Sequence, residues 1–178
     1  MSTPLLEVEG LRTVFHAVEG AWPAVDGVGF RLDAGEVLGL VGESGSGKSV
    51  TGFSLVGLVD PPGEVVAGAV RFRGTDLRGL GEEALRRLRG DRIAMIFQDP
   101  LMTLNPVLTI GEQMEEALTE HHRIAPEAAR ERVLSALGKV GITDPAARLR
   151  QYPHEFSGGM RQRVAIATAL LNEPDLII

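Results

Sequence analysis

Apolar and polar residues mix at short spacing in four stretches of the chain, and glycine and proline clusters separate these stretches. This pattern is typical of β-strands with one covered face. The four stretches are residues 5–9, 11–15, 25–32 and 65–73. We therefore expect an antiparallel β region over residues 1–35 and 64–74.

Two further runs, residues 36–41 and 93–97, are almost continuously apolar. Strands of a parallel sheet that are covered on both faces have this composition. The tail, residues 174–178, has the same character and is predicted to begin another buried strand. These runs predict an α/β core that comprises residues 36–60, 91–98 and 156–178.

Between the core segments, the pattern changes to helical spacing. Thr109 and Glu112 have the spacing of a capping box, and apolar residues follow it at intervals of three and four. The same periodicity returns after Pro126, and Asp144, which a proline follows, is predicted to cap another helix. We expect a helical insert over residues 107–151.

Composition narrows the class of protein. The chain has 178 residues, of which 44% are hydrophobic and 24% charged, and these values fit one globular domain and exclude a disordered chain. The net charge of -6 disfavours a nucleic-acid-binding protein. The sequence has no cysteine, which excludes disulfides and zinc thiolates and fits the cytoplasm. We expect neither a membrane span nor an export signal.

Residues 42–49 read Gly-Glu-Ser-Gly-Ser-Gly-Lys-Ser and match the phosphate-loop pattern G-x-x-x-x-G-K-[ST]. The loop follows an apolar run and precedes an expected helix, residues 49–59. Glycines allow backbone N–H groups to converge on phosphates, Lys48 can reach the β and γ phosphates, and the Ser49 hydroxyl can bind Mg²⁺. The alternative is a glycine-rich turn, but Lys48 is one of only two lysines among 18 basic residues. The motif therefore predicts nucleotide binding.

A second motif precedes the apolar helix-forming run 164–171. Residues 156–163 read Phe-Ser-Gly-Gly-Met-Arg-Gln-Arg, with Ser157 as the expected N-cap. By itself, this could be an ordinary helix cap with flexible glycines. Beside a phosphate loop, it resembles the Leu-Ser-Gly-Gly-Gln signature of the ATP-binding subunits of ABC transporters, with Phe156 and Met160 at its ends. Gln98, which closes the run 93–97, is similar to the Q-loop glutamine of that family.

Three stretches, residues 97–100, 104–113 and 152–163, resemble the di- and oligopeptide or nickel importer branch of the family. Residues 101–103, Leu-Met-Thr, depart from that branch. The resemblance implies a P-loop NTPase core with an antiparallel β subdomain and a helical insert. It also implies ATP and Mg²⁺ as cofactors and a peripheral position at the cytoplasmic face of the cell membrane. The implied partners are a second ATPase subunit, identical or different, integral membrane permease subunits and, indirectly, an extracytoplasmic solute-binding protein; nucleic acid is not among them.

The resemblance also assigns residues. Lys48 and Gln98 would assist hydrolysis, and Ser49 and Gln98 would hold the metal. The implied nucleotide contacts are Phe15, Gly42, Glu43, Ser44, Gly45, Ser46, Gly47, Lys48, Ser49, Val50, Gln98, Ser157, Gly158, Gly159 and Met160. In the family, two subunits pair head to tail, which implies that the signature would act on the nucleotide of the partner subunit. It lies 109 residues after Lys48, beyond the helical insert.

Some assignments leave alternatives open. Phe15 aligns with the residue on which the family stacks adenine, but it could be an ordinary core residue, and His16 and Trp22 are nearby rivals. Met102, Leu104, Val107 and Leu108 either pack inward or accept a short helix of a membrane subunit, and we favour docking. The arginines at positions 86, 87, 89 and 92 fit a solvated helix face, because acidic residues surround them.

In the family that the chain resembles, the strand predicted at residues 174–178 ends with a metal-holding aspartate and a catalytic glutamate. The sequence stops at Ile178, before both, so we expect this chain alone to hydrolyse ATP poorly. Three hypotheses follow: the motor subunit of a peptide-type importer, a nucleotide-binding module without turnover of its own, and a soluble ABC protein of DNA repair or translation. The last would need a basic surface that the composition does not favour.

Overall fold

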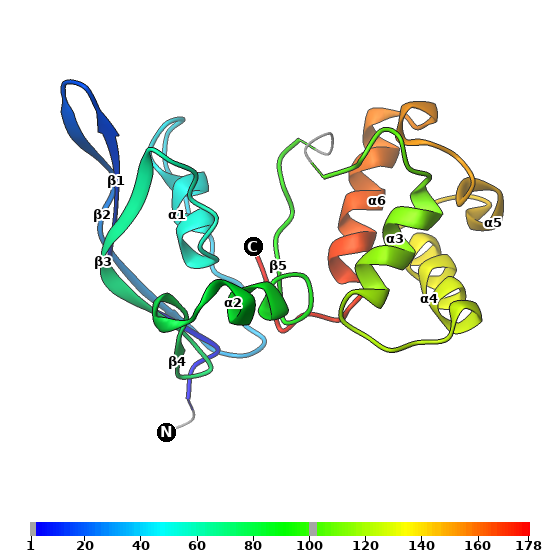
Figure 1. The fold of residues 1–178 in the computed structure, drawn as a ribbon, viewed down its shortest axis with the longest axis horizontal. Helices are drawn as coiled ribbons and strands as arrows, with labels where there is room; N and C mark the ends of the chain where they lie inside the picture. Colours follow the sequence, from blue (N-terminus) through cyan, green and yellow to red (C-terminus); the bar gives the residue numbers. More distant parts are fainter. Residues whose placement is uncertain (1–2, 100–102) are drawn as a thin grey trace. The chain divides into compact units, whose positions relative to one another are not determined.

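The computed structural model describes residues 3–99 and 103–178. The chain divides into two compact units, Met1–Arg86 and Arg87–Ile178 (Figure 1). In these described ranges, no helix combines the length and the apolar character that crossing a membrane requires.

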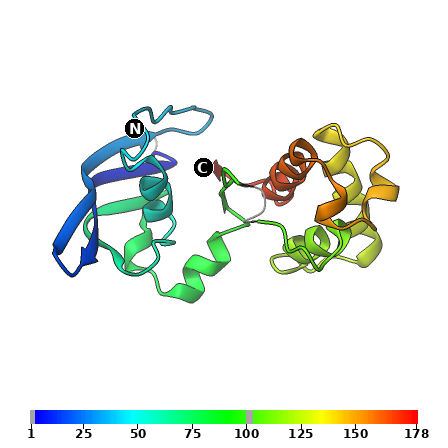
Figure 2. The ribbon, with the colours of Figure 1, turned by 90° about the horizontal axis from the view of Figure 1, so that it is seen from above.

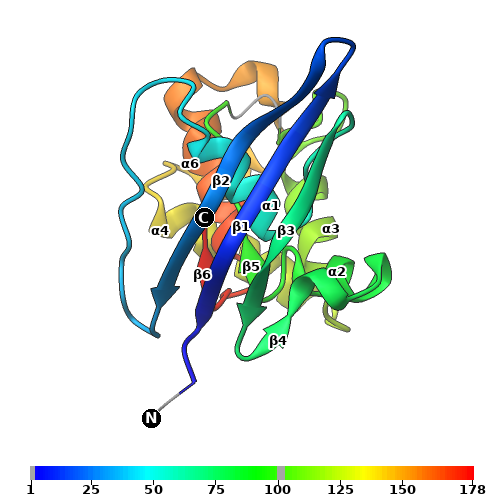
Figure 3. The same cartoon turned by 90° about the vertical axis from the view of Figure 1, so that its left-hand side faces the viewer.

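The first unit contains an antiparallel sheet of strand order β2-β1-β3-β4 (Figure 3). Its strands are β1 (Leu6–Ala17), β2 (Gly20–Leu32), β3 (Gly63–Phe72) and the short β4 (Thr75–Asp76). The expected antiparallel region is confirmed, but the two stretches predicted at 5–9 and 11–15 form one strand. Gly10, with φ of 57°, lies in an irregularity of the β1–β2 register, where its backbone freedom allows a bulge in place of a chain break.

Helix α1 (Lys48–Leu55) packs against this sheet. The buried hydroxyls of Thr13, on β1, and Ser54, on α1, form a hydrogen bond of 2.7 Å. The helix is shorter than the predicted 49–59. It ends in a Schellman arrangement, in which Gly57 has φ of 66° and the N–H of Leu58 donates to the carbonyl of Phe53 at 2.9 Å.

The prediction of a strand at residues 36–41 is wrong. The segment between β2 and α1 is irregular (Figure 3), and within the described part of the chain it joins neither sheet. Val37 and Val41 are 98% and 91% exposed. An apolar run becomes a strand only where a neighbouring strand takes up its backbone hydrogen bonds, and the strands of its own unit already pair with one another.

A short 3-10 turn, Leu77–Gly79, and helix α2 (Glu82–Leu88) follow the sheet. The basic cluster begins on α2, and two of its four arginines form ion pairs. Arg86 pairs with Glu83 at 3.3 Å, and Arg92 forms an ion pair with Asp175. The cluster therefore does not form an isolated positive patch.

The second unit is mainly helical, as predicted for residues 107–151 (Figure 2). Its helices share one apolar core, to which Ile110, Met114 and Leu118 contribute fully buried side chains. The capping box is present: the N–H of Thr109 donates to Glu112 at 2.8 Å, and the N–H of Glu112 donates to the Thr109 hydroxyl at 3.3 Å. The helices are α3 (Ile110–Thr119), α4 (Pro126–Lys139), α5 (Pro145–Arg148) and α6 (Gly158–Leu170), with a 3-10 turn at Pro153–Glu155.

The same unit contains the parallel pair β5 (Ile93–Ala94) and β6 (Leu176–Ile177). The strand predicted for the tail is confirmed. The strand predicted over residues 93–97 is shorter than expected, although the N–H of Ile96 still donates to the carbonyl of Ile178 at 2.8 Å. Met95, Ile96 and Phe97 are half-buried, so this run lacks the cover on both faces that its composition predicted.

Candidate nucleotide-binding site

The phosphate loop lies directly against strand β2. Gly45 and Gly47 have φ values of 80° and 88°, in the left-handed region that glycine adopts at little cost. A Cβ atom on Gly47 would stand 2.2 Å from the carbonyl oxygen of Ala24, which is too close for any side chain. A Cβ on Gly42 would stand 2.6 Å from the Ser46 hydroxyl oxygen. The glycines of the motif are therefore required by both backbone conformation and space.

The side chain of Lys48 folds back over the loop. Its Nζ donates to the carbonyl oxygens of Gly42 and Glu43 at 2.7 and 2.6 Å, and to the Ser46 hydroxyl at 3.2 Å. These three oxygens hold the ammonium group above the loop. Because phosphate oxygens are stronger acceptors for an ammonium group than carbonyls, they could replace some of these bonds.

Helix α1 begins at the end of this loop. Its N-cap is Gly47, which brings no side-chain acceptor to the first backbone N–H groups. The first turn, Lys48-Ser49-Val50, adds no negative charge, so the positive end of the helix dipole is available to an anion. Ser49 is exposed and Val50 is half-buried. The loop, the ammonium group and the Ser49 hydroxyl fit a triphosphate with a divalent cation.

Phe15 lies on β1 in the same unit, and its ring is half-buried. A Cβ on Gly63 would stand 2.8 Å from this ring and 2.6 Å from a methyl group of Val59. Trp22 is directly opposite Phe15 on β2 and is 61% exposed. His16 is 3.5 Å from Glu64. Trp22 is therefore more accessible than Phe15, and His16 is exposed as well.

Gln98 lies in the second unit, in the bend that follows β5, and its side chain is exposed. It comes after the carboxyl end of this parallel strand, an edge at which α/β proteins commonly bind ligands. The loop after it, up to residue 99, is described, whereas Pro100, Leu101 and Met102 lie outside the described residues. The predicted docking role of Met102 is therefore not tested.

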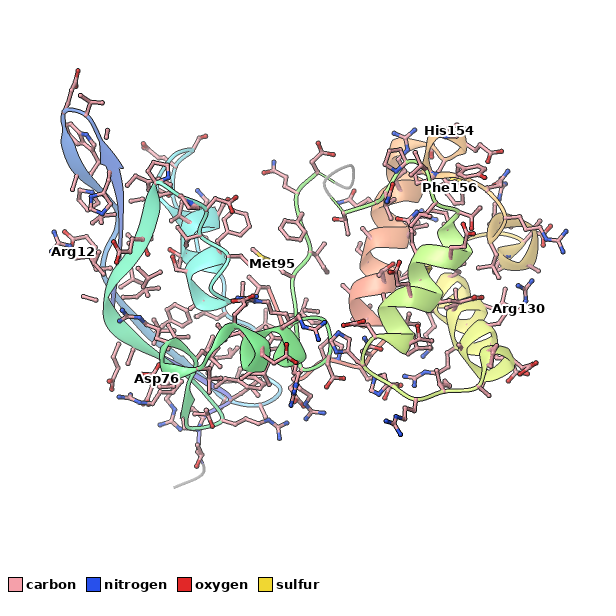
Figure 4. The ribbon with its side chains drawn as sticks, in the orientation of Figure 1. Arg12, Asp76, Met95, Arg130, His154 and Phe156 are labelled. Atoms are coloured by element: carbon pink, nitrogen blue, oxygen red, sulfur yellow. The ribbon has the colours of Figure 1, made fainter. Side chains whose placement is uncertain are left out.

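The signature residues form the N-terminus of α6, as Figure 4 shows with Phe156 and His154 at this end of the helix. Ser157 is the N-cap, as predicted, and accepts a hydrogen bond from the N–H of Met160 at 3.3 Å. Phe156 is buried and fixes the start of the helix in the core. Gly158 and Gly159 are exposed, and open space surrounds the position of a Cβ on either. The motif therefore presents an accessible helix N-terminus.

The predicted site residues fall into two groups. Phe15 and the phosphate loop belong to the first unit, and Gln98 and the signature belong to the second. The remaining predicted contacts, Glu43 and Ser44, are exposed parts of the loop. Each group lies entirely within one unit.

A cavity of about 510 Å³, which we did not predict from the sequence, lies between α4 and the C-terminal part of α6. Arg132, Ser135 and Lys139 line it from α4, and Leu170 and Leu171 line it from α6. The positions 132, 135 and 139 follow helical spacing, so the sequence contained a signal that these polar residues share one face of α4.

One member of the predicted docking set, Leu104, instead packs inward. It is 6% exposed and belongs to the helical core, whereas Val107 is 74% exposed. The preference for docking at Leu104 is therefore wrong, because the side chain fills a place among the apolar residues of the helices. Leu108 is half-buried.

Residues 25–178 match the ABC transporter family. The chain is 50% identical over 175 residues to the dipeptide transport ATP-binding protein DppD of Bacillus subtilis (strain 168), covering 98% of this chain and 52% of that protein. It is 49% identical over 177 residues to the oligopeptide transport ATP-binding protein OppD of the same organism, covering 99% of this chain and 49% of that protein. The chain thus spans about half the length of the curated relatives it matches.

A solved structure with a similar fold is the dimeric ATP-binding cassette MJ0796, in a post-hydrolysis state bound to ADP and Pi. It gives a TM-score of 0.85 at 28% identity, covering 97% of this chain and 72% of that one. The family match, the relatives and this fold agree with the phosphate loop and the signature. The chain belongs to the ABC transporter family, and its fold is that of an ABC ATPase cassette.

Proposed function

We propose that this chain is the ATP-binding part of a motor subunit that drives the import of peptides. The observation that carries the proposal is the phosphate loop, in which Gly47 packs on Ala24 and the Lys48 ammonium group lies over the loop. The peptide class of solute rests on the two Bacillus relatives, whose names state dipeptide and oligopeptide transport.

In this proposal, backbone N–H groups of the loop and of the first turn of α1 bind the phosphates. Lys48 would exchange its carbonyl acceptors for phosphate oxygens, and the residues that would hold Mg²⁺ are Ser49, through its hydroxyl, and Gln98, as the family resemblance implies. When bound, Mg²⁺ neutralises charge on the β and γ phosphates. Phe15, on β1 of the same unit, contacts the base. The other loop contacts are Gly42, Glu43, Ser44, Gly45, Ser46 and Val50.

The signature completes the site of a second chain. Ser157, Gly158, Gly159 and Met160 present the open N-terminus of α6, which suits a γ-phosphate. The MJ0796 cassette, which is dimeric and was bound to ADP and Pi, supports such an arrangement. We propose that two ATPase subunits, identical or different, pair in this way at the cytoplasmic face of the membrane. Their further partners are membrane permease subunits and, indirectly, a solute-binding protein.

The test is the affinity for the fluorescent nucleotide mant-ATP of the unmodified chain, the Lys48→Ala variant and the Lys139→Ala variant. Lys139 is the only other lysine in the sequence and lies on α4, so it is a matched control for loss of one ammonium group. We expect Lys48→Ala to weaken binding at least tenfold and Lys139→Ala to leave it unchanged. Equal affinities for all three proteins would refute the proposal.

A second measurement separates the motor from a nucleotide-binding module. Phosphate release by the purified chain with MgATP reports turnover directly. Turnover that Lys48→Ala abolishes would show an active ATPase. Binding without measurable turnover would favour the nucleotide-binding module, with hydrolysis residing elsewhere in the assembly.

A further inference from the structure

The cavity between α4 and α6 lies entirely within the second unit and includes no residue of the phosphate loop or the signature. Its volume of about 510 Å³ is typical of pockets that bind small ligands, which range from about 300 to 1,000 Å³. At one end of the helix pair, Arg132 of α4 donates to the carbonyl of Leu171 at 3.0 Å. At the other end, Arg163 of α6 donates to the carbonyl of Gly141, just after α4, at 3.1 Å. The helices are therefore antiparallel, and the cavity runs along them.

The apolar part of the lining comes from both helices. It consists of Ala136 and Val140 on α4 and of Ala167, Leu170 and Leu171 in or just after α6. The Leu170 side chain is 41% exposed, and a leucine gains free energy when a ligand removes its surface from water. This part of the cavity therefore suits an apolar group of a ligand.

Two hydrogen-bond donors of the lining are neighbours on α4. Ser135 and Lys139 are four residues apart, a spacing that places side chains next to each other on a helix surface. Within the described part of the chain, neither the Ser135 hydroxyl nor the Lys139 ammonium group has a hydrogen bond or an ion pair. Ammonium and hydroxyl groups both donate to carboxylates, and the bond from an ammonium group is the stronger. This part of the lining therefore suits a carboxylate.

The opposite charge lies at the other end of the cavity. Glu173 comes two residues after Leu171, the residue to which Arg132 donates. It is the only acidic residue among the described lining residues, and none of them pairs with it. The last carbonyls of α6 carry the negative end of the helix dipole, which also attracts a cation. The Arg132 guanidinium is positive but already donates to the Leu171 carbonyl. This end therefore suits an ammonium group that pairs with Glu173.

The separation of the two ends sets the length of the ligand. Lys139 and Arg132, which marks the Glu173 end, are seven residues apart on α4, and a helix rises about 1.5 Å per residue, which gives about 10 Å. An extended chain of three residues spans about the same length. A free amino acid has both charges on one carbon atom and cannot reach both ends.

We infer that the cavity binds a short peptide of about three residues with free termini. Its carboxylate pairs with Lys139 and Ser135, its ammonium group pairs with Glu173, and an apolar side chain lies against the alanines and leucines between them. The inference rests on the proposed function, since a peptide importer brings such peptides to the side of the membrane on which its motor subunit works.

The first experiment measures the affinity of the chain for the tripeptide Ala-Leu-Ala by calorimetry. Three matched ligands separate the interactions: the N-acetylated tripeptide lacks the ammonium group, the tripeptide amide lacks the carboxylate, and leucine has both charges on one carbon atom. Each should bind about tenfold more weakly than the tripeptide, because each loses a bond between charged groups. Equal binding of the blocked tripeptides would overturn the recognition of both termini, and equal binding of leucine would overturn the peptide class.

Variants test whether the peptide lies in this cavity. Lys139→Ala and Glu173→Gln should each weaken tripeptide binding about tenfold and leave the affinity for mant-ATP unchanged. Lys139→Ala should also bind the tripeptide and its amide equally, because the partner of the carboxylate is gone. The control is Arg130→Ala, which removes a positive charge from the same helix and should change neither affinity. Arg130, labelled in Figure 4, is exposed and does not line the cavity.

The outcomes separate this inference from the proposed function. If the unmodified chain binds mant-ATP but not the tripeptide, the inference is overturned and the proposed function stands. Tripeptide binding that is the same in Lys139→Ala, Glu173→Gln and Arg130→Ala would place the peptide elsewhere and would also overturn the inference. Failure of the unmodified chain to bind mant-ATP would instead refute the proposed function, whatever the tripeptide does.

Discussion

Gly47 of the phosphate loop and Ala24 of strand β2 lie so close that a Cβ atom on Gly47 would stand 2.2 Å from the Ala24 carbonyl oxygen. The obstacle is backbone within a paired strand, which cannot move aside as a flexible side chain can. This contact fixes the start of α1 on the sheet and gives the loop its shape. The binding of a phosphate group therefore depends on a residue that the motif does not include.

The contact predicts the effect of Gly47→Ala. The new methyl group would clash with Ala24 and would also stand at φ of 88°, where an L-residue loses roughly 1–2 kcal/mol. The loop must shift, so we expect the affinity for mant-ATP to fall more than tenfold.

The matched control is Gly39→Ala, a glycine in the same connecting segment around which the space for a Cβ is open. It should bind mant-ATP like the unmodified chain. If Gly47→Ala also bound normally, the loop would not need its contact with β2.

Leu104 and Val107 are predicted to behave differently. Truncating the buried Leu104 to alanine leaves a cavity in the helical core and should lower the free energy of unfolding by about 2–4 kcal/mol. Val107→Asp should leave the stability unchanged, because Val107 is 74% exposed. Urea unfolding followed by circular dichroism measures both. A stable Leu104→Ala variant would argue that Leu104 is free to dock a partner.

Glu112 links the stability of α3 to pH. Hydrogen bonds from the Thr109 side chain and backbone lower the pKa of the Glu112 carboxyl below its usual 4.5. A lowered pKa in the folded state means that the ionised form stabilises the fold above the unfolded pKa, and that this contribution disappears as the pH falls through the folded pKa. Glu112→Ala should therefore destabilise the chain at neutral pH and have a smaller effect in acid. An effect independent of pH would contradict this role of the carboxylate.

Several local structures were predictable because neighbouring residues determine them. Thr109 and Glu112 form their capping box within one helical turn, and Asp144 and Ser157 cap helices as the sequence indicates. The glycines of the motif at residues 42–49 likewise predict the phosphate loop. These interactions need no information about distant parts of the chain.

Other features depend on tertiary contacts that the sequence does not display. The apolar composition of residues 36–41 predicted a buried strand, but the segment is exposed because no described strand pairs with it. The greater exposure of Trp22 compared with Phe15 likewise depends on Gly63 and Val59, which are far from Phe15 in sequence. Periodicity could identify the aromatic residues but not their packing.

The exposed segment makes a prediction about amide exchange. Without a partner strand, the N–H groups of residues 37–41 should exchange with deuterium nearly as fast as in an unstructured peptide. The N–H groups of β1, which lies between two strands, should exchange much more slowly. Slow exchange over residues 37–41 would show that the segment pairs in solution.

The most direct test of the account is to ask whether one site uses two chains. Lys48→Ala removes the ammonium group from the phosphate loop, and Ser157→Arg blocks the start of α6. Neither variant alone should form a MgATP-dependent dimer by light scattering, because every site would contain a defect. An equimolar mixture should form a dimer, since the loop of Ser157→Arg and the signature of Lys48→Ala together make one intact site. A mixture that stays monomeric, while the unmodified chain dimerises with MgATP, would contradict the shared site.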